Sequence, residues 1–239
     1  MSPVLKDKNV REDLLDASIK LFAHNGFDGT SIRDIIKDAN ATLSSVTYYF
    51  GGKENLYHET IRYVMNEKIQ MEDLFLEFVD AELKTDQETS DQLALLVRKL
   101  ALSFLDTEKP NWYGELFARA MLDSTHGSIE VFLEKRLAIE EFEDRLQEKV
   151  SENITFKPEV FTTNMFAQIQ FMALAKQLIL ESRNMEDYTR DYIEGVIHQI
   201  TRNLIIPLGL PEPDFYFTKL KSNINKFNIL IQEEKNEAL

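Results

Sequence analysis

Apolar residues recur at intervals of three and four along almost the whole chain, and no stretch shows the two-residue alternation of a strand. Residues 32–39 are typical, because the apolar residues at positions 32, 35, 36 and 39 would share one face of a helix. Only eight glycines and six prolines interrupt the 239 residues, so breaks are few and their positions are informative. The pattern predicts an all-α fold of about ten helices.

The breaks and caps set the expected helices. The first helix should end at Asn25 and Gly26, and Thr30 or Ser31 should cap the second. Asn40 tolerates a positive φ, and Thr42 fits an N-cap, so a short third helix should follow. Two short helices are therefore expected between residues 31 and 50. The others should cover residues 10–24, 53–83, 91–105, 112–122, 128–150, 158–182, 187–206 and 215–233.

Charge is divided unevenly along the chain. There are 41 acidic and 27 basic residues, which gives a net charge of −14. Residues 1–57 hold seven of the basic and eight of the acidic residues, so this segment is close to neutral and the excess lies in residues 58–239. Phosphate binding depends on local groups, and a near-neutral segment of an acidic chain remains compatible with it.

Several classes of protein are not indicated. The chain has no cysteine, which excludes disulfides, thiolate zinc sites and a cysteine nucleophile. It shows no apolar run of ~18 residues for a membrane span and no apolar signal-peptide core. The common enzyme fingerprints are missing, and the four histidines are scattered. We expect a cytoplasmic protein with no enzyme activity, no metal, no cofactor and no membrane partner.

The stretch LSSVTYYFGGKENLY, residues 43–57, gathers hydroxyl side chains and two tyrosines next to a glycine pair and a lysine. Val46 and Phe50 lie one helical turn apart and should both point inward. Three short helices, the last two joined by a tight turn, predict a helix-turn-helix arrangement whose third helix enters the major groove of DNA. Hydroxyl groups can bond base edges, while phenol and ammonium groups can reach phosphates. The alternative is an ordinary solvated helix.

A family resemblance rests on four runs in this region. They are T-S-I-R-D-I-I from residue 30, A-N-A-T from residue 39, V-T-Y-Y-F from residue 46 and K-E-N-L from residue 53. In order and spacing they resemble the N-terminal domain of TetR-type transcriptional regulators, over residues 9–60. The run V-T-Y-Y-F-G-G-K-E-N-L-Y is similar to the CecR-like subgroup of that family.

The resemblance implies the contacts with DNA. They are Ser31 and Arg33 in the second helix, Leu43, Ser44, Ser45 and Thr47 facing the bases, and Tyr48, Tyr49 and Lys53 at phosphates. Asn40 stands where the family commonly has glycine. Leu43 replaces a residue that is often polar, so contact with a thymine methyl group replaces a base hydrogen bond as the candidate interaction there. For either tyrosine, packing against the first helix is the alternative.

The resemblance also implies an architecture and a function. It implies a homodimer with a helix-turn-helix DNA-binding domain over residues 1–57 and a helical effector-binding and dimerisation domain over residues 58–239. Such a protein would be a ligand-responsive repressor, released from a partly palindromic double-stranded operator by a small-molecule effector that is largely apolar. The alternative is a TetR-like adaptor that has lost DNA binding and acts through protein partners.

The second domain is expected to hold an effector pocket and a dimer interface. The pocket candidates are Phe104, Trp112, Phe117, Met121, Asn164, Gln168, Phe171 and Met172, with His126 as a further polar anchor. The dimer interface is expected to be a four-helix contact made by the segments 158–182 and 187–206 of each chain. Its candidate residues are Leu174, Leu178, Ile193, Val196, Ile197, Ile200 and Leu204. For each of these residues the alternative is packing inside a single chain.

Overall fold

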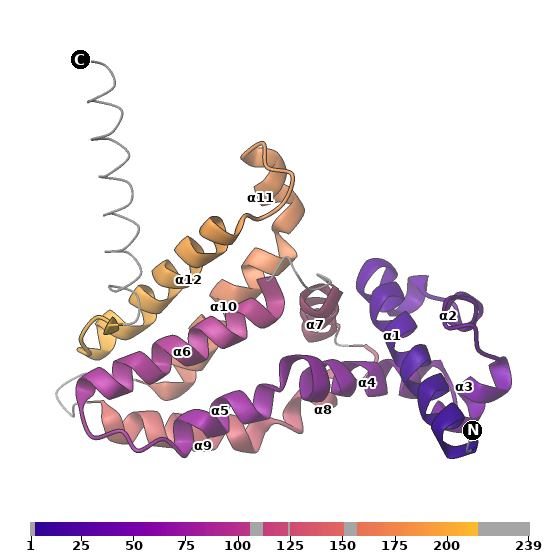
Figure 1. Ribbon diagram of the computed structural model, residues 1–239, viewed down its shortest axis with the longest axis horizontal. Coiled ribbons are helices and arrows are strands. Elements are labelled where there is room, and N and C mark those ends of the chain that lie inside the picture. The colour runs from indigo at the N-terminus through magenta and orange to yellow at the C-terminus, as the bar shows by residue number, and fades with distance from the viewer. Residues whose placement is uncertain (1–2, 106–111, 124, 151–156, 215–239) are drawn as a thin grey trace.

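The computed structural model describes residues 3–105, 112–123, 125–150 and 157–214, and the side chains of these from residue 10 onward. This part of the chain forms twelve α-helices, one π-helical turn and one 3-10 turn, with no strand (Figure 1). The first four helices are α1 (Pro3–Gly29), α2 (Ile32–Asp38), α3 (Leu43–Phe50) and α4 (Lys53–Tyr63). The others are α5 (Met71–Val79), α6 (Asp86–Leu105), α7 (Trp112–Leu122), α8 (Ser128–Leu133), α9 (Arg136–Lys149), α10 (Pro158–Leu174), α11 (Lys176–Ser182) and α12 (Arg190–Ile205).

The helices fall into two groups at opposite ends of the molecule (Figure 1). We call α1–α3 and the first half of α4 the head, and the remaining helices the body. In the body, α5 packs on α6 and α9, while α12 packs on α6 and α10. Helix α4 runs through residue 57 without a break, so the expected domain boundary lies inside a helix that the head and the body share.

The caps of the head are those that the sequence predicts. Ser31 accepts a hydrogen bond from the backbone N–H of Asp34 and caps α2, and Thr42 caps α3 by accepting from the backbone N–H of Ser45. Asn40 has a φ of 48°. Gly51 ends α3 in the left-handed conformation with a φ of 74°, which costs glycine little. The tight turn between α2 and α3 therefore follows from local chemistry.

The first helix differs from the prediction, because it kinks where an end is expected. Gly26 has a φ of 70° and a ψ of −177°, and the helix resumes on its far side as far as Gly29. The hydroxyl of Thr30 donates to the backbone oxygens of Leu21 at 3.0 Å and of Gly26 at 2.8 Å. These bonds tie Thr30, which follows the kink, to carbonyl groups before and at the kink and hold its angle.

Three predicted helices of the body are divided in the structure. The 53–83 segment contains a π-helical turn, Val64–Ile69, and Gln70 with a φ of 55°. The 128–150 segment divides at Glu134 and Lys135, and the 158–182 segment at Ala175. None of these breaks carries a glycine or a proline, so no local signal marks them.

Other body helices shift their starts or match the prediction. Helix α6 begins at Asp86 instead of residue 91, because the Glu88 carboxylate accepts from the backbone N–H groups of Lys84 at 2.7 Å and Thr85 at 2.9 Å. Helix α12 begins at Arg190, with Thr189 as its cap, instead of residue 187. Helix α7 has the predicted bounds of 112–122. The expected helix over residues 215–233 lies outside the described residues.

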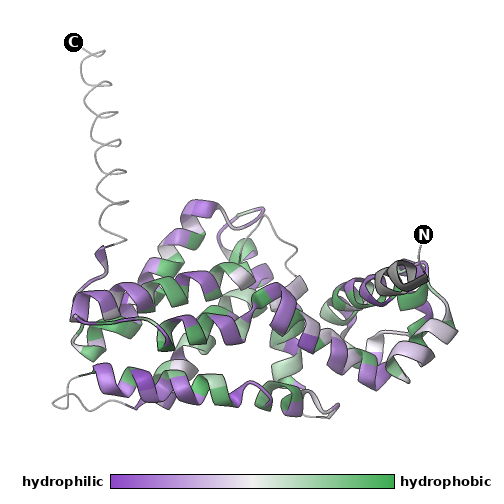
Figure 2. Ribbon diagram, turned by 60° about the horizontal axis from the view of Figure 1, so that its bottom comes forward, coloured by the Kyte–Doolittle hydropathy of each residue, from purple (hydrophilic) through white to green (hydrophobic). Residues whose placement is uncertain are grey.

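One continuous apolar core extends from the head into the body. In the head, Phe22 lies against Tyr57 with 4.9 Å between ring centroids. In the body, Phe75 and Phe78 both pack on Phe142, with centroids 5.2 and 5.0 Å apart. Apolar and polar residues alternate around most helices, as expected for helices with one buried face (Figure 2). No helix in the described ranges is long and apolar enough to span a membrane.

Replacing Thr30 by valine tests the kink. The side chain keeps its shape and its burial, being 2% exposed, but the carbonyl groups of Leu21 and Gly26 lose a donor. We expect the free energy of unfolding to fall by about 1–3 kcal/mol, measured by urea denaturation. The control is the same change at exposed Thr163, whose hydroxyl donates to the Glu159 backbone oxygen at 2.7 Å; the expected loss there is below about 0.5 kcal/mol. Equal losses at the two sites would contradict the role given to Thr30.

Candidate nucleic-acid interface

Helix α3 presents one exposed face and buries the other. Val46 and Phe50 are buried in the head core, as the sequence predicts. Leu43 is 61% exposed, Ser44 and Thr47 are exposed, and Ser45 is half-buried. A short helix with small side chains on its outer face can approach the floor of a major groove closely. The geometry therefore fits a recognition helix.

The hydroxyl groups on this face have local hydrogen-bond partners. The Thr42 hydroxyl oxygen lies 2.9 Å from those of both Ser44 and Ser45, and the Thr47 hydroxyl donates to the Leu43 backbone oxygen at 3.1 Å. These groups are exposed or nearly so, and a hydroxyl can rotate about its C–O bond. They can therefore exchange these bonds for base edges at low cost.

The two tyrosines play different structural parts. Tyr48 is 81% exposed, whereas Tyr49 is half-buried and packs against the core. Their rings meet edge to face with 4.9 Å between centroids, so Tyr49 supports Tyr48 from the core side. The packing alternative thus describes Tyr49, and Tyr48 offers its phenol outward.

Three further predicted residues flank α3. Arg33 is exposed on α2 and makes no ion pair with any described residue. The Ser31 hydroxyl donates to the Asp34 carboxylate at 2.6 Å, in addition to its capping role. The ammonium of Lys53 lies 4.3 Å from the centroid of the Phe27 ring, a cation–π contact that holds it at the start of α4. The Lys53 ammonium is therefore held in place at the start of α4.

Sequence reasoning missed Lys37 as a member of this surface. It is exposed on α2 and lies four residues after Arg33, so the two cations share one side of that helix. The four-residue spacing of Arg33 and Lys37 was the sequence signal that could have identified Lys37. Lys37 adds a second positive charge to the side of the head that carries Arg33.

The head meets the body at a corner between α7 and α8, where His126 lies. The Phe27 ring stacks on His126 with 4.0 Å between centroids, and His58 Nε2 lies 2.5 Å from the His126 backbone oxygen. His126 Nδ1 lies 2.8 Å from the Asp123 carboxylate. The prediction of His126 as an anchor in the effector pocket is therefore replaced by a role at the junction.

Two pKa shifts mark this junction. Burial, and then the charge of Asp123 and a hydrogen bond to it, raise the pKa of Tyr57 far above its ordinary value, so this phenol stays protonated. Burial alone would raise the pKa of Asp123. Hydrogen bonds from the backbone and hydroxyl of Thr125 and from His126 outweigh burial and lower the Asp123 pKa below its ordinary value.

A second junction contact joins α4 to the end of α8. The Arg62 guanidinium bonds both carboxylate oxygens of Glu134, at distances from 2.6 to 3.1 Å, and Glu59 at 3.0 Å. Hydrogen bonds from Arg62 hold the pKa of Glu134 below its ordinary value. This bidentate pair joins the residue that ends α8 to α4.

The predicted pocket residues do not form one site. Phe117 and Met121 line a mostly apolar recess of about 300 Å³ beside α8, together with Met65, Met71 and Phe132. Phe104 is buried behind Phe117, with 5.0 Å between centroids, and Trp112 lies against Lys20 and His24 of α1. The two aromatic side chains of Phe104 and Trp112 are thus packing residues.

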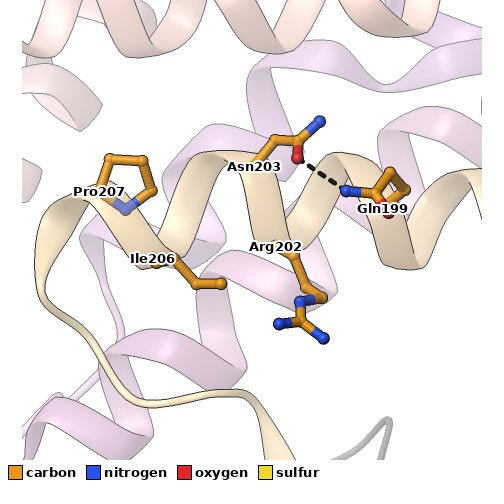
Figure 3. Close-up of a pocket in the computed structure, with 5 residues that line it drawn as sticks. All are labelled: Gln199, Arg202, Asn203, Ile206 and Pro207. Carbon is orange, nitrogen blue, oxygen red and sulfur yellow. Dashed lines mark hydrogen bonds between the residues drawn. The ribbon is translucent and has the colours of Figure 1, made fainter.

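The other four pocket candidates lie on the outer side of α10. Gln168, Phe171 and Met172 line a shallow hollow of about 510 Å³ between α10 and α12, and Asn164 lines a neighbouring one. A third hollow, near the end of α12, is lined by Gln199, Arg202, Asn203, Ile206 and Pro207 (Figure 3). Gln168 and Gln199 both hydrogen-bond Asn203, at 3.0 and 2.8 Å. Together these hollows follow one open face.

The interface candidates divide in the same way. Ile193, Ile197, Ile200 and Leu204 are buried in the core of the single chain, as the packing alternative describes, although Ile200 and Leu204 also line hollows of the open face. Periodicity identifies an apolar face but does not say which neighbour covers it. Val196 is half-buried, and Leu174 and Leu178 are exposed. Val160, Phe171 and Ile206 are exposed apolar residues of the same region that the sequence did not single out for the interface.

Comparison with known proteins supports the assignment of the head. Residues 14–60 match the family described as "Bacterial regulatory proteins, tetR family". The "Probable HTH-type transcriptional regulator YttP" of Bacillus subtilis is 30% identical over 89 residues, which are 37% of this chain and 41% of that protein. The Staphylococcus aureus "Biofilm operon icaADBC HTH-type negative transcriptional regulator IcaR" is 32% identical over 53 residues, 22% of this chain and 28% of that protein.

Solved structures extend the likeness to the fold of the body. A TetR family transcription regulator from Marinobacter aquaeolei covers 82% of this chain, and 96% of its own length, with a TM-score of 0.60 at 18% identity. The Bacillus subtilis regulator FadR, solved with stearoyl-CoA, covers 81% of this chain and 97% of its own, with a TM-score of 0.60 at 14% identity. Residues 14–60 thus resemble the N-terminal domain of tetR-family regulators, and the fold of most of the chain is similar to that of these solved structures. These relatives are transcriptional regulators and not enzymes.

Asp123→Asn tests the junction through pH. The lowered pKa of Asp123 contributes stability above the unfolded-state pKa of about 3.9, and this contribution is lost as pH falls through the lower folded-state value. The stability difference between the native protein and the variant should therefore be largest above about pH 4 and shrink below it, measured by urea denaturation across pH 3–7. Exposed Asp73→Asn is the control and should show a small, flat difference. A difference that grows towards low pH would contradict the assignment.

Proposed function

We propose that the chain is a dimeric, ligand-responsive DNA-binding transcriptional regulator that acts as a repressor and is released from its operator by a small-molecule effector. The observation that carries this proposal is the exposed polar face of α3, held on a buried apolar face by capped neighbours in a tetR-family domain. Among the relatives, IcaR is named a negative transcriptional regulator, which favours repression. The protein acts in the cytoplasm, where DNA is accessible to it.

In this function α3 enters the major groove. Ser44 and Thr47 bond base edges, Ser45 assists from its half-buried position, and Leu43 contacts a thymine methyl group. Phosphate contacts come from the rest of the surface, which consists of Ser31, Arg33, Lys37, Tyr48 and Lys53. Tyr49 acts by supporting Tyr48. Each phosphate neutralised by a cation releases counterions, so affinity falls steeply as salt rises.

Dimerisation places two heads on one operator. The outer face of α10–α12 offers exposed Val160, Phe171, Leu174, Leu178 and Ile206 around the polar group of Gln168, Gln199 and Asn203. A self-complementary contact there would relate two chains by a twofold axis and match a partly palindromic site. The two α3 helices would then enter grooves about 34 Å apart. We retain residues 1–57 as the DNA-binding domain and residues 58–239 as the effector-binding and dimerisation domain.

Effector binding can reach the head through α8. Ile129, Phe132 and Leu133 of this helix line the apolar recess, and its two ends meet the head side through His126 and Glu134. An effector that prefers one position of α8 therefore biases α4 and, through it, the spacing of the two α3 helices. A coupling of about 1–3 kcal/mol would change operator affinity roughly 5–150-fold. FadR was solved with stearoyl-CoA, so that molecule serves as an anionic comparison ligand.

Capture of genomic DNA from the source organism tests the proposal directly. The purified protein should enrich a few sites that share an inverted repeat, identified by sequencing the bound fragments. The control is Ser44→Glu, which places a carboxylate on the groove side of α3 without disturbing the core, since Ser44 is exposed. No enrichment by the native protein would overturn the DNA-binding proposal and favour the adaptor alternative, whereas equal enrichment by the two proteins would remove Ser44 from the base contacts.

Arg33→Ala tests the phosphate surface once an operator fragment is known. Affinity should fall similarly for operator and unrelated DNA, and the slope of log affinity against log salt should decrease by about one. Fluorescence anisotropy at several salt concentrations measures both. Arg183→Ala, an exposed arginine of the body, is the matched control and should leave both quantities unchanged. An unchanged slope in Arg33→Ala would remove Arg33 from the phosphate contacts.

Phe171→Asp tests the dimer face. Phe171 is 59% exposed in one chain, so aspartate is tolerated in the monomer but brings a charge into an apolar contact. We expect a monomer by sedimentation equilibrium, with lower operator affinity. Leu137→Asp, at an exposed leucine on α9, is the matched control and should stay dimeric. A dimeric Phe171→Asp variant would place the interface elsewhere.

A further inference from the structure

A second recess adjoins the apolar one described above. It has a volume of about 440 Å³ and lies between the end of α7, α9 and α10. Met121, Ile139 and Phe166 line both hollows and form the wall between them. The volumes are in the range of small-molecule sites, and methionine and isoleucine side chains can repack around an apolar body. The two hollows together offer an apolar end and a polar end.

The polar end contains a buried amide without a partner. Gln170 lines the recess, is only 6% exposed, and neither its amide nitrogen nor its amide oxygen has a hydrogen-bond partner in the described part of the chain. Buried polar groups in folded proteins are nearly always bonded, and an exception calls for a missing water, ion or ligand. Gln170 therefore marks a place where a polar group from outside the chain would be bound.

The charge around Gln170 is negative. Glu143 and Glu159 line the recess, and neither forms an ion pair with a described residue. Glu143 accepts a hydrogen bond from the buried Thr162 hydroxyl, which fixes the position of its carboxylate. Among the described residues, no lysine or arginine lines this recess. Lys135, which lines the neighbouring apolar hollow, is already paired with Glu72 at 2.5 Å.

We propose that the effector is an apolar molecule with a cationic amine head group. The head group donates hydrogen bonds to the Gln170 amide oxygen and to the Glu143 carboxylate, and Glu159 adds negative charge at the mouth. The apolar body lies against Met121, Ile139 and Phe166 and extends towards α8. A carboxylate or phosphate head would meet two uncompensated carboxylates and is disfavoured there. This inference rests on the proposed function, because it specifies the effector of the same regulator.

The test compares three probes that share a dodecyl chain. Dodecylamine is cationic at pH 7, since ordinary amines have a pKa near 10.4; dodecanol is neutral and dodecanoate is anionic. Isothermal titration calorimetry with the full-length protein, below the micelle concentration, should show one amine per chain, bound at least about tenfold more tightly than dodecanoate, with dodecanol between them. Binding of dodecanoate or stearoyl-CoA as tight as that of dodecylamine would overturn the proposal.

Two variants assign the binding to this recess. Glu143→Gln keeps an acceptor for Thr162 and removes the charge, so dodecylamine affinity should fall several-fold while dodecanol affinity stays the same; Glu141→Gln, on the exposed side of α9, should change neither. Gln170→Leu should weaken dodecylamine binding and raise the melting temperature of the ligand-free protein, because an unpaired buried amide is removed. Exposed Gln147→Leu is its control. Unchanged dodecylamine affinity in both Glu143→Gln and Gln170→Leu would place the ligand elsewhere.

The effector proposal and the regulator proposal can fail separately, because ligand binding and DNA capture are measured independently. Dodecylamine that binds in calorimetry and also releases captured DNA supports both. Dodecylamine that binds without releasing DNA supports the ligand site and overturns only its role as the effector site. DNA capture that succeeds while the three probes bind equally overturns the amine proposal and leaves the regulator in place.

Discussion

The stack of Phe27 on His126 anchors the junction at which the head meets the body, beside the helix α4 that both share. Phe27 follows the kink at Gly26, so its position is fixed by the Thr30 hydroxyl bonds across that kink. His126 is fixed in turn by Asp123 and by its backbone contact with His58. The two rings lie 4.0 Å apart and join the kink of α1 to the corner between α7 and α8. A head mounted on a straight first helix would have no such partner in the body.

The same corner also determines what α8 can do. The Ser128 hydroxyl donates to the backbone oxygens of Ala120 and Asp123, at 2.7 and 2.6 Å, and ties the start of α8 to the end of α7. At its other end Glu134 is held by Arg62 of α4. Between these two fixed ends, α8 exposes apolar side chains to the recess. A short helix that is bonded to a neighbouring helix at each end and contacts a ligand in the middle can pass a ligand-induced shift to both neighbours.

Local chemistry explains why the head could be predicted from sequence. Ser31, Thr42, Asn40 and Gly51 each act on the backbone within a few residues of themselves, and these effects alone determine α2, α3 and the turn between them. The outward face of α3 then follows from the four-residue spacing of Val46 and Phe50. The kink at Gly26 was not predicted, because it depends on Thr30 bonding back across the turn.

The body was harder to predict because tertiary packing decides its breaks and its faces. Gln70 takes a positive φ and Ala175 ends a helix without any glycine or proline nearby. Ile197 and Leu178 both belong to apolar stripes, yet one is fully buried and the other exposed. The sequence identifies the apolar stripe of a helix but not the segment that packs against it. The recess around the unpaired Gln170 amide is likewise formed by three helices, α7, α9 and α10, that meet only in the folded chain.

The division of charge between head and body gives both proposed sites one physical basis. A near-neutral head can bring Arg33 and Lys37 to phosphates. The acidic body repels the DNA backbone, and this repulsion acts over a screening length of about 8 Å in physiological salt. In the proposed complex this charge distribution favours orientations in which the heads face the DNA. The same negative body lowers the energy of a cation that enters the recess at Glu143. The negative charge of the body therefore disfavours contact with DNA and favours binding of the proposed cationic effector. Both effects suit a regulator that is to leave DNA when its effector binds.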